Sequence, residues 1–254
     1  MQRVQFIGRV FPSAIKVTVS LPELKWKWVE QSLELTFRVK IGNSFVNVEC
    51  DIDSYKQEYF HELYRRALDL ARASVNLIGF AHGFGLTVML EAIIMPDGAP
   101  SEIALIDNQL APLCTAYSVG TEGDINFSQV LNAVVMTPDL FMALDDLIQA
   151  ITLPHAAPVN CARAMDRLKF LIAGTDLSDK QAWQRMRDAL QLDEGFLRYI
   201  TDVSKNPRHG RPGRTPGSEA GEATRRAWAV MNRYFEYVKR GRQPLSLPDF
   251  PLLK

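Results

Sequence analysis

The chain has 254 residues, of which 47% are hydrophobic and 23% charged, and its 29 Lys and Arg balance its 29 Asp and Glu. This composition is typical of a globular protein with its own core, and it excludes a wholly disordered chain. No apolar run approaches the roughly 18 residues of a membrane-spanning helix, and the N-terminus alternates instead of forming a secretory signal.

The first fifty residues alternate apolar and polar side chains, the pattern of strands that are buried on one face. β-Branched and aromatic residues recur with a period of two in four runs, at 4–6, 15–19, 33–41 and 45–48. Gly42-Asn43-Ser44 predicts a hairpin turn between the last two runs, because Gly and Asn tolerate a positive φ.

A helical period follows the strands. Ser54 with Gln57 three residues later forms a capping box, which predicts that a helix begins here. Apolar side chains then line one helical face, and charged side chains line the opposite face. The helix is expected over residues 54–82, where glycines end it.

Two more strands are expected after this helix, at Leu86–Met95 and Ile103–Ile106. The turn residues Pro96-Asp97-Gly98 separate them. A further strand is expected near residues 113–119. We therefore predict an antiparallel, β-rich domain with one packed helix over residues 1–124.

The strand pattern stops after about residue 125, and helical periods replace it. Pro138 and Pro158 suit the first turns of two helices, and Ser218 is expected to cap a long helix that Gly241 ends. The shorter helices are predicted at residues 127–135, 138–152, 158–173, 179–191 and 193–204.

The predicted fold class is therefore α+β, with an antiparallel β-rich region first and an all-α helical bundle after it. The helical domain is expected over residues 125–243. The last segment, 244–254, is rich in proline and apolar residues, which predicts an irregular tail packed along the body of the protein.

The motifs of common cofactor and metal sites are absent. The sequence has no P-loop, no G-x-G-x-x-G after a strand, no paired C-x-x-C and no H-E-x-x-H, and its four histidines lack metal-ligand spacing. Asp51 and Asp53 are interpreted as a strand end and an acidic helix start, not as metal ligands. We predict no cofactor and no metal.

The three cysteines are far apart and odd in number. Cys50, Cys114 and Cys161 argue against a disulfide framework and favour a reducing compartment, so a cytoplasmic protein is expected. Cys161 shares a helical stripe with Met165 and Leu168. This spacing predicts a buried, inert thiol, because a reactive cysteine needs a partly exposed, electropositive setting.

The zero net charge hides a partition along the chain. Residues 1–50 carry seven Lys and Arg against four Asp and Glu, residues 51–154 carry four against fourteen, and residues 155–254 carry eighteen against eleven. One interpretation is an acidic and a basic layer that face each other within the chain. The other is a basic surface for nucleic acid or phosphate.

One loop, predicted at residues 205–214, concentrates positive charge without an acidic residue. Arginine suits bidentate phosphate contacts, and a helix N-terminus nearby favours anions. One alternative is a solvated surface loop whose positive charge balances the acidic segment 51–154. The other is that Arg208 and His209 form hydrogen bonds with the ends of neighbouring helices. The candidate anion or nucleic-acid ligands are Lys205, Asn206, Arg208, His209, Arg211, Arg214, Arg225 and Arg226.

Residues 127–240 are expected to form antiparallel helices with a basic, His-bearing turn before the last helix. In this respect they resemble the helical HEPN domains of prokaryotic toxin and phage-defence proteins. In that family an Arg followed after four to six residues by a His forms a metal-independent ribonuclease site. The resemblance places His209 at the histidine, whereas Arg208 is adjacent to it and Arg198 lies eleven residues upstream.

The segment Asn206-Pro207-Arg208-His209-Gly210, with Arg225-Arg226-Ala227-Trp228 after it, is also similar to a group of uncharacterised bacterial proteins.

The leading hypothesis is a non-catalytic binding protein whose Arg-rich loop faces RNA or another phosphate-bearing ligand. The first alternative is a ribonuclease in which His209 is the general acid or base and Arg208 stabilises the developing charge. The second alternative is a structural subunit of an oligomer. A protein partner or a homo-oligomer is compatible with the charge blocks, and no membrane partner is expected.

Overall fold

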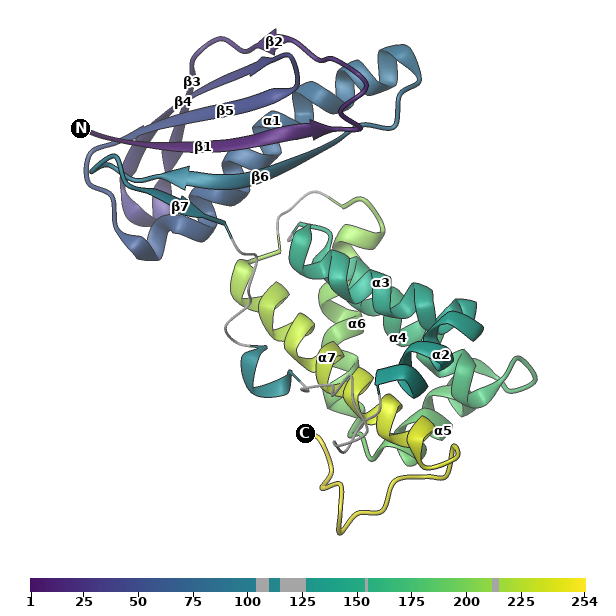
Figure 1. The fold of residues 1–254 in the computed structure, drawn as a ribbon. Coiled ribbons are helices and arrows are strands. Elements are labelled where there is room, and N and C mark those ends of the chain that lie inside the picture. The colour runs from purple at the N-terminus through teal and green to yellow at the C-terminus, as the bar shows by residue number, and fades with distance from the viewer. Residues whose placement is uncertain (104–109, 115–126, 154, 212–214) are drawn as a thin grey trace. The chain divides into compact units, whose positions relative to one another are not determined.

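The computed structural model describes residues 1–103, 110–114, 127–153, 155–211 and 215–254, and the chain divides into two compact units, Met1–Ala104 and Leu105–Lys254 (Figure 1). The first unit is an antiparallel sheet with a helix, and the second is helical. The predicted α+β class is thus confirmed, while the predicted boundary at residues 124 and 125 lies outside the described residues. Within those residues, no helix is long and apolar enough to cross a membrane.

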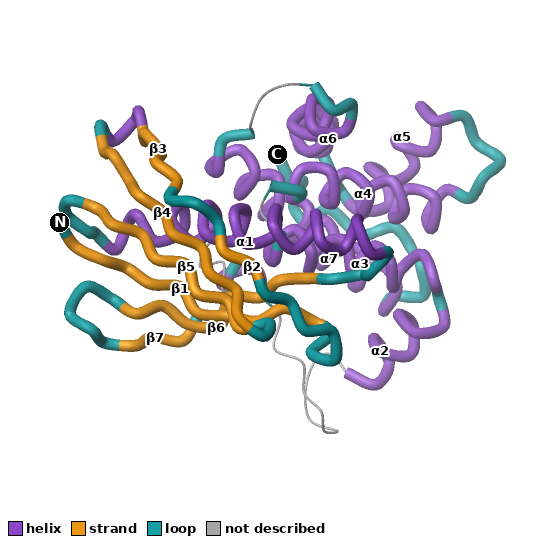
Figure 2. The backbone as a smooth tube through the Cα atoms, turned by 90° about the horizontal axis from the view of Figure 1, so that it is seen from above, coloured by secondary structure: helices purple, strands orange, loops and turns teal. Residues whose placement is uncertain are grey.

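The first unit is built on one seven-stranded sheet in which every pairing is antiparallel (Figure 2). Its order is β2-β4-β5-β1-β6-β7, and β3 pairs with β4. The strands are β1 (Gln2–Phe11), β2 (Val19–Ser20), β3 (Leu24–Trp28), β4 (Leu33–Gly42), β5 (Phe45–Ile52), β6 (Thr87–Ile94) and β7 (Pro100–Glu102).

Helix α1 (Phe60–His82) lies across one face of this sheet (Figure 1). The strand residues with alternate spacing, such as Phe6, Phe37 and Val48, are fully buried on that face. Leu63 and Ala67 on α1 are buried in the same core. The apolar residues that alternate along the strands therefore pack against those that recur about every 3.6 residues along the helix, as the sequence predicts.

The hairpin turn between β4 and β5 is confirmed. Asn43 and Ser44 have φ values of 51° and 70°, and Gly42 pairs with Phe45 on either side of them. Two central residues with positive φ match the twist of the flanking strands. Ser44 is also held from outside the turn, because its hydroxyl donates to the Ile15 carbonyl at 2.8 Å.

Strands β1 and β6 approach closely at Gly8. Their register shifts between Ile7 and Gly8. A Cβ at position 8 would collide with the carbonyl oxygen of Met89 and would lie 2.8 Å from the Cα of Leu90. Glycine is the residue whose backbone permits this contact.

Three expectations for the first unit are wrong in detail. The strand expected at 15–19 is reduced to β2, and β3 was not predicted. The capping box at Ser54 does not start a helix: this segment is a bend, and the Tyr55 amide donates to the Gln2 side chain at 2.6 Å. The chain then forms a 3₁₀ turn before α1. The strands expected at 103–106 and 113–119 fall mostly outside the described residues.

The second unit contains six α-helices among its described residues (Figure 1). Pro138 and Pro158 lie in first turns, as predicted, and a core centred on Met165, Met186 and Tyr234 joins the helices. The helices are α2 (Phe127–Met136), α3 (Pro138–Thr152), α4 (Ala157–Ala173), α5 (Asp179–Leu190), α6 (Glu194–Arg208) and α7 (Gly217–Lys239).

Two helix ends differ from the prediction. Helix α6 continues past residue 204 to Arg208 and includes Pro207 in its last turn, so the first part of the expected loop is helical. Helix α7 begins at Gly217 without a side-chain cap, and Ser218 therefore lies inside the helix. Gly241, with φ 67°, follows its end as predicted.

The C-terminal tail packs on the helices. Leu245 is 2% exposed, and its amide donates to the Ala189 carbonyl at 2.9 Å. Leu253 forms a parallel bridge with Leu192. Leu245, Phe250 and Leu253 of the tail thus pack at the edge of the helical core.

Candidate anion-binding site

The predicted basic residues gather at the end of α6. Lys205 and Arg208 lie in its last two turns, His209 is the C-cap, and Arg211 follows. These side chains are exposed, as is that of Asn206. Arg214 lies outside the described residues. The helix thus presents its cations at the C-terminal end, where the helix dipole favours positive charge.

Two of these cations pair with carboxylates of the same unit. The Lys205 ammonium lies 2.7 Å from Asp202, and Arg208 donates to Asp166 on α4 at 3.3 Å. Lys205 also holds the pKa of Asp202 below its usual range. The side chains of Arg208 and Asp166 are 48% and 28% exposed. Such surface pairs contribute about 0–1 kcal/mol, so another anion can replace the carboxylate at little cost.

Asp166 also joins this turn to a buried lysine. The Lys169 ammonium, 4% exposed, lies 3.3 Å from Asp166 and 2.6 Å from Asp179. It also lies 4.6 Å from the ring centres of Phe170 and Trp183. Two carboxylates and two aromatic faces compensate the desolvated charge. The end of α6 is therefore held by a network that reaches α4 and α5.

Arg225 and Arg226 serve a different, structural purpose. Both guanidinium groups donate to Glu222 one turn earlier, at 2.6 to 2.7 Å. Arg226 also lies 4.4 Å from the ring centre of Tyr199 and 5.0 Å from that of Phe196. This arrangement ties α7 to α6. The contacts separate these two arginines from the exposed cations at the end of α6.

Glu222 gives the C-terminal unit an acid-sensitive contact. The hydrogen bonds from Arg225, with those from Arg226, lower the pKa of Glu222 to about 2. A lowered carboxylate pKa stabilises the fold above the unfolded-state value of about 4.3, and this contribution disappears as the pH falls toward 2.

We therefore expect the free energy of unfolding to fall between pH 6 and pH 2 by roughly 2 kcal/mol more in the wild type than in Glu222→Gln. This figure is reduced for solvent screening. Urea unfolding at both pH values measures the difference, and parallel losses in the two proteins would contradict it.

The buried thiol and a buried carboxylate lie together in the helical core. Cys161 is 0% exposed, as predicted, and burial raises its pKa to about 12. Its sulfur contacts the Thr224 hydroxyl at 3.7 Å. Asp146 is 1% exposed and lies 3.1 Å from Arg163 and 3.4 Å from Arg167. This geometry describes an inert thiol and a structural ion pair between α3 and α4.

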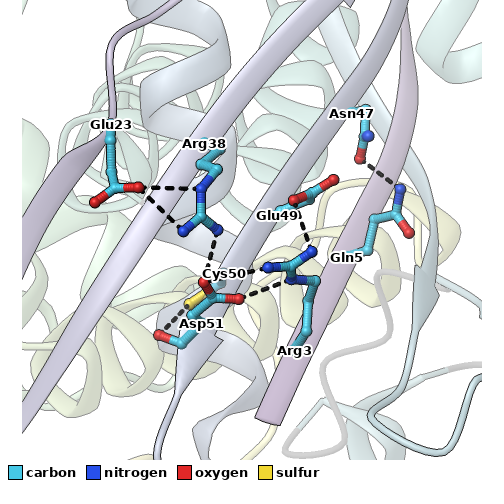
Figure 3. A network of polar contacts seen from close by, with 8 residues as sticks. All are labelled: Arg3, Gln5, Glu23, Arg38, Asn47, Glu49, Cys50 and Asp51. Carbon is cyan, nitrogen blue, oxygen red and sulfur yellow. Dashed lines mark hydrogen bonds and ion pairs between the residues drawn. The ribbon is translucent and has the colours of Figure 1, made fainter. Parts of the chain in front are cut away.

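A second charge network lies on the sheet (Figure 3). Asp51, 6% exposed, accepts hydrogen bonds from Arg3 at 2.7 Å and from Arg38 at 2.6 Å. The Arg3 contact contributes most to a lowered pKa of Asp51. Glu49 and Glu23 pair with the outer sides of the two guanidinium groups. Asp51 thus joins β1, β5 and β4 at the end of strand β5, as interpreted from the sequence, whereas the helix start expected at Asp53 is not formed there.

The carboxylates that pair with the predicted cations were not predicted. Asp202 and Lys205 have the i, i+3 spacing of a helical ion pair, so the sequence contained a signal for this contact. Asp166 and Arg208 are 42 residues apart, and only the tertiary fold brings them together. The structure gives no group of three or more metal-ligating side chains in the residues that it describes.

Family models match both units of the chain. The model for the N-terminal domain of a domain of unknown function (DUF8168) matches residues 4–104, and the model for its C-terminal domain matches residues 127–239. Searches of curated proteins and of solved structures found no match. The two models follow each other in the expected order and cover most of the sequence. The chain belongs to the two-domain DUF8168 family.

Proposed function

We propose that this protein is a non-catalytic binding protein and that the end of α6 binds the phosphate groups of RNA. The observation that carries the proposal is a set of exposed cations whose carboxylate partners are weakly held. Lys205 and Arg208 have surface ion pairs, and no carboxylate contact of Arg211 is found among the described residues. An RNA backbone supplies phosphates that can take the place of these carboxylates.

The local charge supports the same proposal. Residues 198–226 carry seven Lys and Arg against three Asp and Glu. The contacts of Arg225 and Arg226 with Glu222 make these two arginines supports for the helix pair. We therefore assign the phosphate contacts to Lys205, Arg208 and Arg211, with His209 beside them as a hydrogen-bond donor.

The test removes the three cations together. One variant combines Lys205→Ala, Arg208→Ala and Arg211→Ala. It should bind single-stranded RNA on the order of 10- to 100-fold more weakly at low salt. The slope of the logarithm of its binding constant against the logarithm of the salt concentration should be smaller in magnitude by about two. Fluorescence anisotropy at several salt concentrations measures both quantities.

The matched control removes three exposed lysines of the first unit, with Lys16→Ala, Lys25→Ala and Lys27→Ala. It should bind RNA like the wild type. Absence of RNA binding by the wild type at low salt, or equal weakening in the control, would refute the proposal.

Removing an acidic partner should have the opposite effect. In Asp166→Asn the Arg208 guanidinium loses its carboxylate, and one negative charge leaves the RNA-facing surface. We expect RNA to bind several-fold more tightly, because a competing anion is gone. Asp176→Asn, an exposed acid on the loop before α5, is the control for charge alone. An Asp166→Asn variant no tighter than this control would argue against Arg208 as a contact.

The ribonuclease, the HEPN resemblance and the oligomer subunit remain predictions from the sequence. Arg208 engages Asp166 and adjoins His209 in the chain, an arrangement that suits phosphate binding without a reaction. Incubation with RNA in EDTA separates the two functions. Cleavage that His209→Ala loses and His82→Ala, at an exposed histidine of the first unit, retains would establish the ribonuclease, whereas intact RNA in a bound complex supports binding alone.

A further inference from the structure

The C-terminal unit contains a cavity at a distance along the chain from the end of α6. It has a volume of about 510 Å³ and lies among α4, α5, the end of α7 and the start of the tail. Ile172, Ala189, Tyr237 and Pro244 form its apolar lining. The cavity is partly open to solvent, and its size and its mixture of apolar and polar walls are compatible with a small molecule.

The wall that the tail provides is fixed by hydrogen bonds. The Leu245 amide donates to the Ala189 carbonyl at 2.9 Å, and the Gln191 side chain donates to the Leu245 carbonyl at 2.7 Å. Leu245 itself is buried. The tail is therefore anchored on α5, and it forms one fixed wall of the cavity.

Two arginines line this cavity, Arg185 from α5 and Arg242 from the segment after α7. In the described part of the chain neither guanidinium has a carboxylate partner. Most other arginines of this unit do have one, as Arg163, Arg167 and Arg208 illustrate. Arg185 and Arg242 are both exposed, so solvent alone offsets their positive charge in the described part of the chain.

The backbone at Arg242 is unusual. Its φ is 63°, and its amide donates to the Tyr237 carbonyl at 2.8 Å. A residue with a Cβ is uncommon in this left-handed region, where glycine or asparagine is favoured. Such a conformation costs of order 1 kcal/mol or more, and residues held this way often belong to functional sites.

The remaining polar lining also favours an anion. Asp188 is the single carboxylate of the lining, and it accepts a hydrogen bond from Gln184 at 2.7 Å. The Gln181 carbonyl oxygen accepts from the amide and hydroxyl of Ser178, at 3.1 and 2.7 Å, so its amide group remains as a donor. Two guanidinium groups against one engaged carboxylate leave an excess of positive charge and of donors.

We propose that this cavity binds a small organic anion. Its carboxylate or phosphate group lies between Arg185 and Arg242, which donate charge-assisted hydrogen bonds. Its apolar or aromatic body packs on Tyr237 and Ile172. This site uses different residues from the proposed RNA surface and does not depend on it.

Calorimetric titration of the full-length protein tests the site with two groups of probes. One group is the nucleoside 5′-monophosphates, with adenosine as the partner that lacks a phosphate. The other is aromatic carboxylates, benzoate and 4-hydroxyphenylacetate, with benzyl alcohol as the neutral partner. We expect saturable binding of at least one anion at or below about 1 mM, and none of its neutral partner. The group that binds identifies the source of the negative charge.

Substitutions assign the binding to the cavity. Arg185→Gln and Arg242→Gly should each weaken the anion about tenfold or more. Glycine suits the positive φ at position 242, so Arg242→Gly is expected to keep or raise the melting temperature, and its loss of binding cannot arise from unfolding. Lys180→Gln, on α5 but outside the lining, should bind like the wild type, as should the variant without Lys205, Arg208 and Arg211. Failure of every anion to bind, or binding that Arg185→Gln and Arg242→Gly leave unchanged, overturns the proposal.

Discussion

Phe37→Ala is expected to lower the free energy of unfolding of the N-terminal unit by about 3–5 kcal/mol. Phe37 is 0% exposed in the centre of β4, and its ring lies 6.4 Å from that of Trp26. The sheet is fixed on both sides by pairing with β3 and β5, so the neighbours cannot collapse fully into the space that the ring leaves. The substitution therefore loses the free energy of burying the ring and also leaves a destabilising cavity.

Hydrogen exchange resolved by peptides measures this loss unit by unit. The two units have separate hydrophobic cores, so amides of β1, β4 and β5 should lose protection while those of α4 and α7 keep it. Thr36→Ala, on the next residue and the opposite face of β4, is the control and should change stability by less than about 1 kcal/mol. An equal loss of protection in both units would show that they unfold as one.

Lys169→Ala has the second large expected effect, a loss of about 3 kcal/mol from the C-terminal unit. The substitution removes the buried stem of the side chain, its contacts with two aromatic rings and its ion pairs with Asp166 and Asp179. Urea unfolding followed by the signal of Trp183, whose ring borders the ammonium, measures the change.

Lys169→Met separates packing from charge. Methionine fills much of the same volume, and the two carboxylates that it leaves behind are 28% and 73% exposed, so water can solvate them. We expect a loss of only about 1 kcal/mol. A Met variant as unstable as the Ala variant would show that the ionic contacts, and not the packed stem, stabilise this part of the protein.

The sequence predicted most elements whose periodicity is long and regular. The run 33–41 alternates strictly because one face of the sheet is buried against α1. The helices of the second unit were recognisable within a few residues, since each has an apolar face and most have a Pro or Gly near an end.

The elements that were missed depend on tertiary contacts. Strand β3 contains Trp26 and Trp28 between lysines, and this alternation becomes a strand through its pairing with β4. The segment after Ser54 is held by a hydrogen bond from the Tyr55 amide to Gln2, which is distant in sequence, and the helix begins only at Phe60. Local propensity could not reveal either contact.

For the candidate site, the sequence identified where cations concentrate and could not identify their partners. The exposed positions of Lys205 and Arg208 follow from their place near a helix end. Glu222 as a partner of Arg226 follows from helical spacing. The contact of Arg208 with Asp166 and the cavity at Arg242 join segments distant in the chain, and no periodicity encodes them.

The close approach of β1 and β6 at Gly8 restricts how this gene can vary. Every missense change of that codon adds at least a methyl group facing the Met89 carbonyl, so β6 would have to move away from β1 before the sheet could close. Strand β6 lies next to β1 and pairs with β7 at Ala92–Ile94, so such a shift would break the pairing of β6 with β1 along Gly8–Phe11. Saturation mutagenesis should therefore recover hardly any folded variant at this codon, whereas the codons of Gly42 and Gly85, where a Cβ would meet open space without a positive φ, should tolerate several replacements.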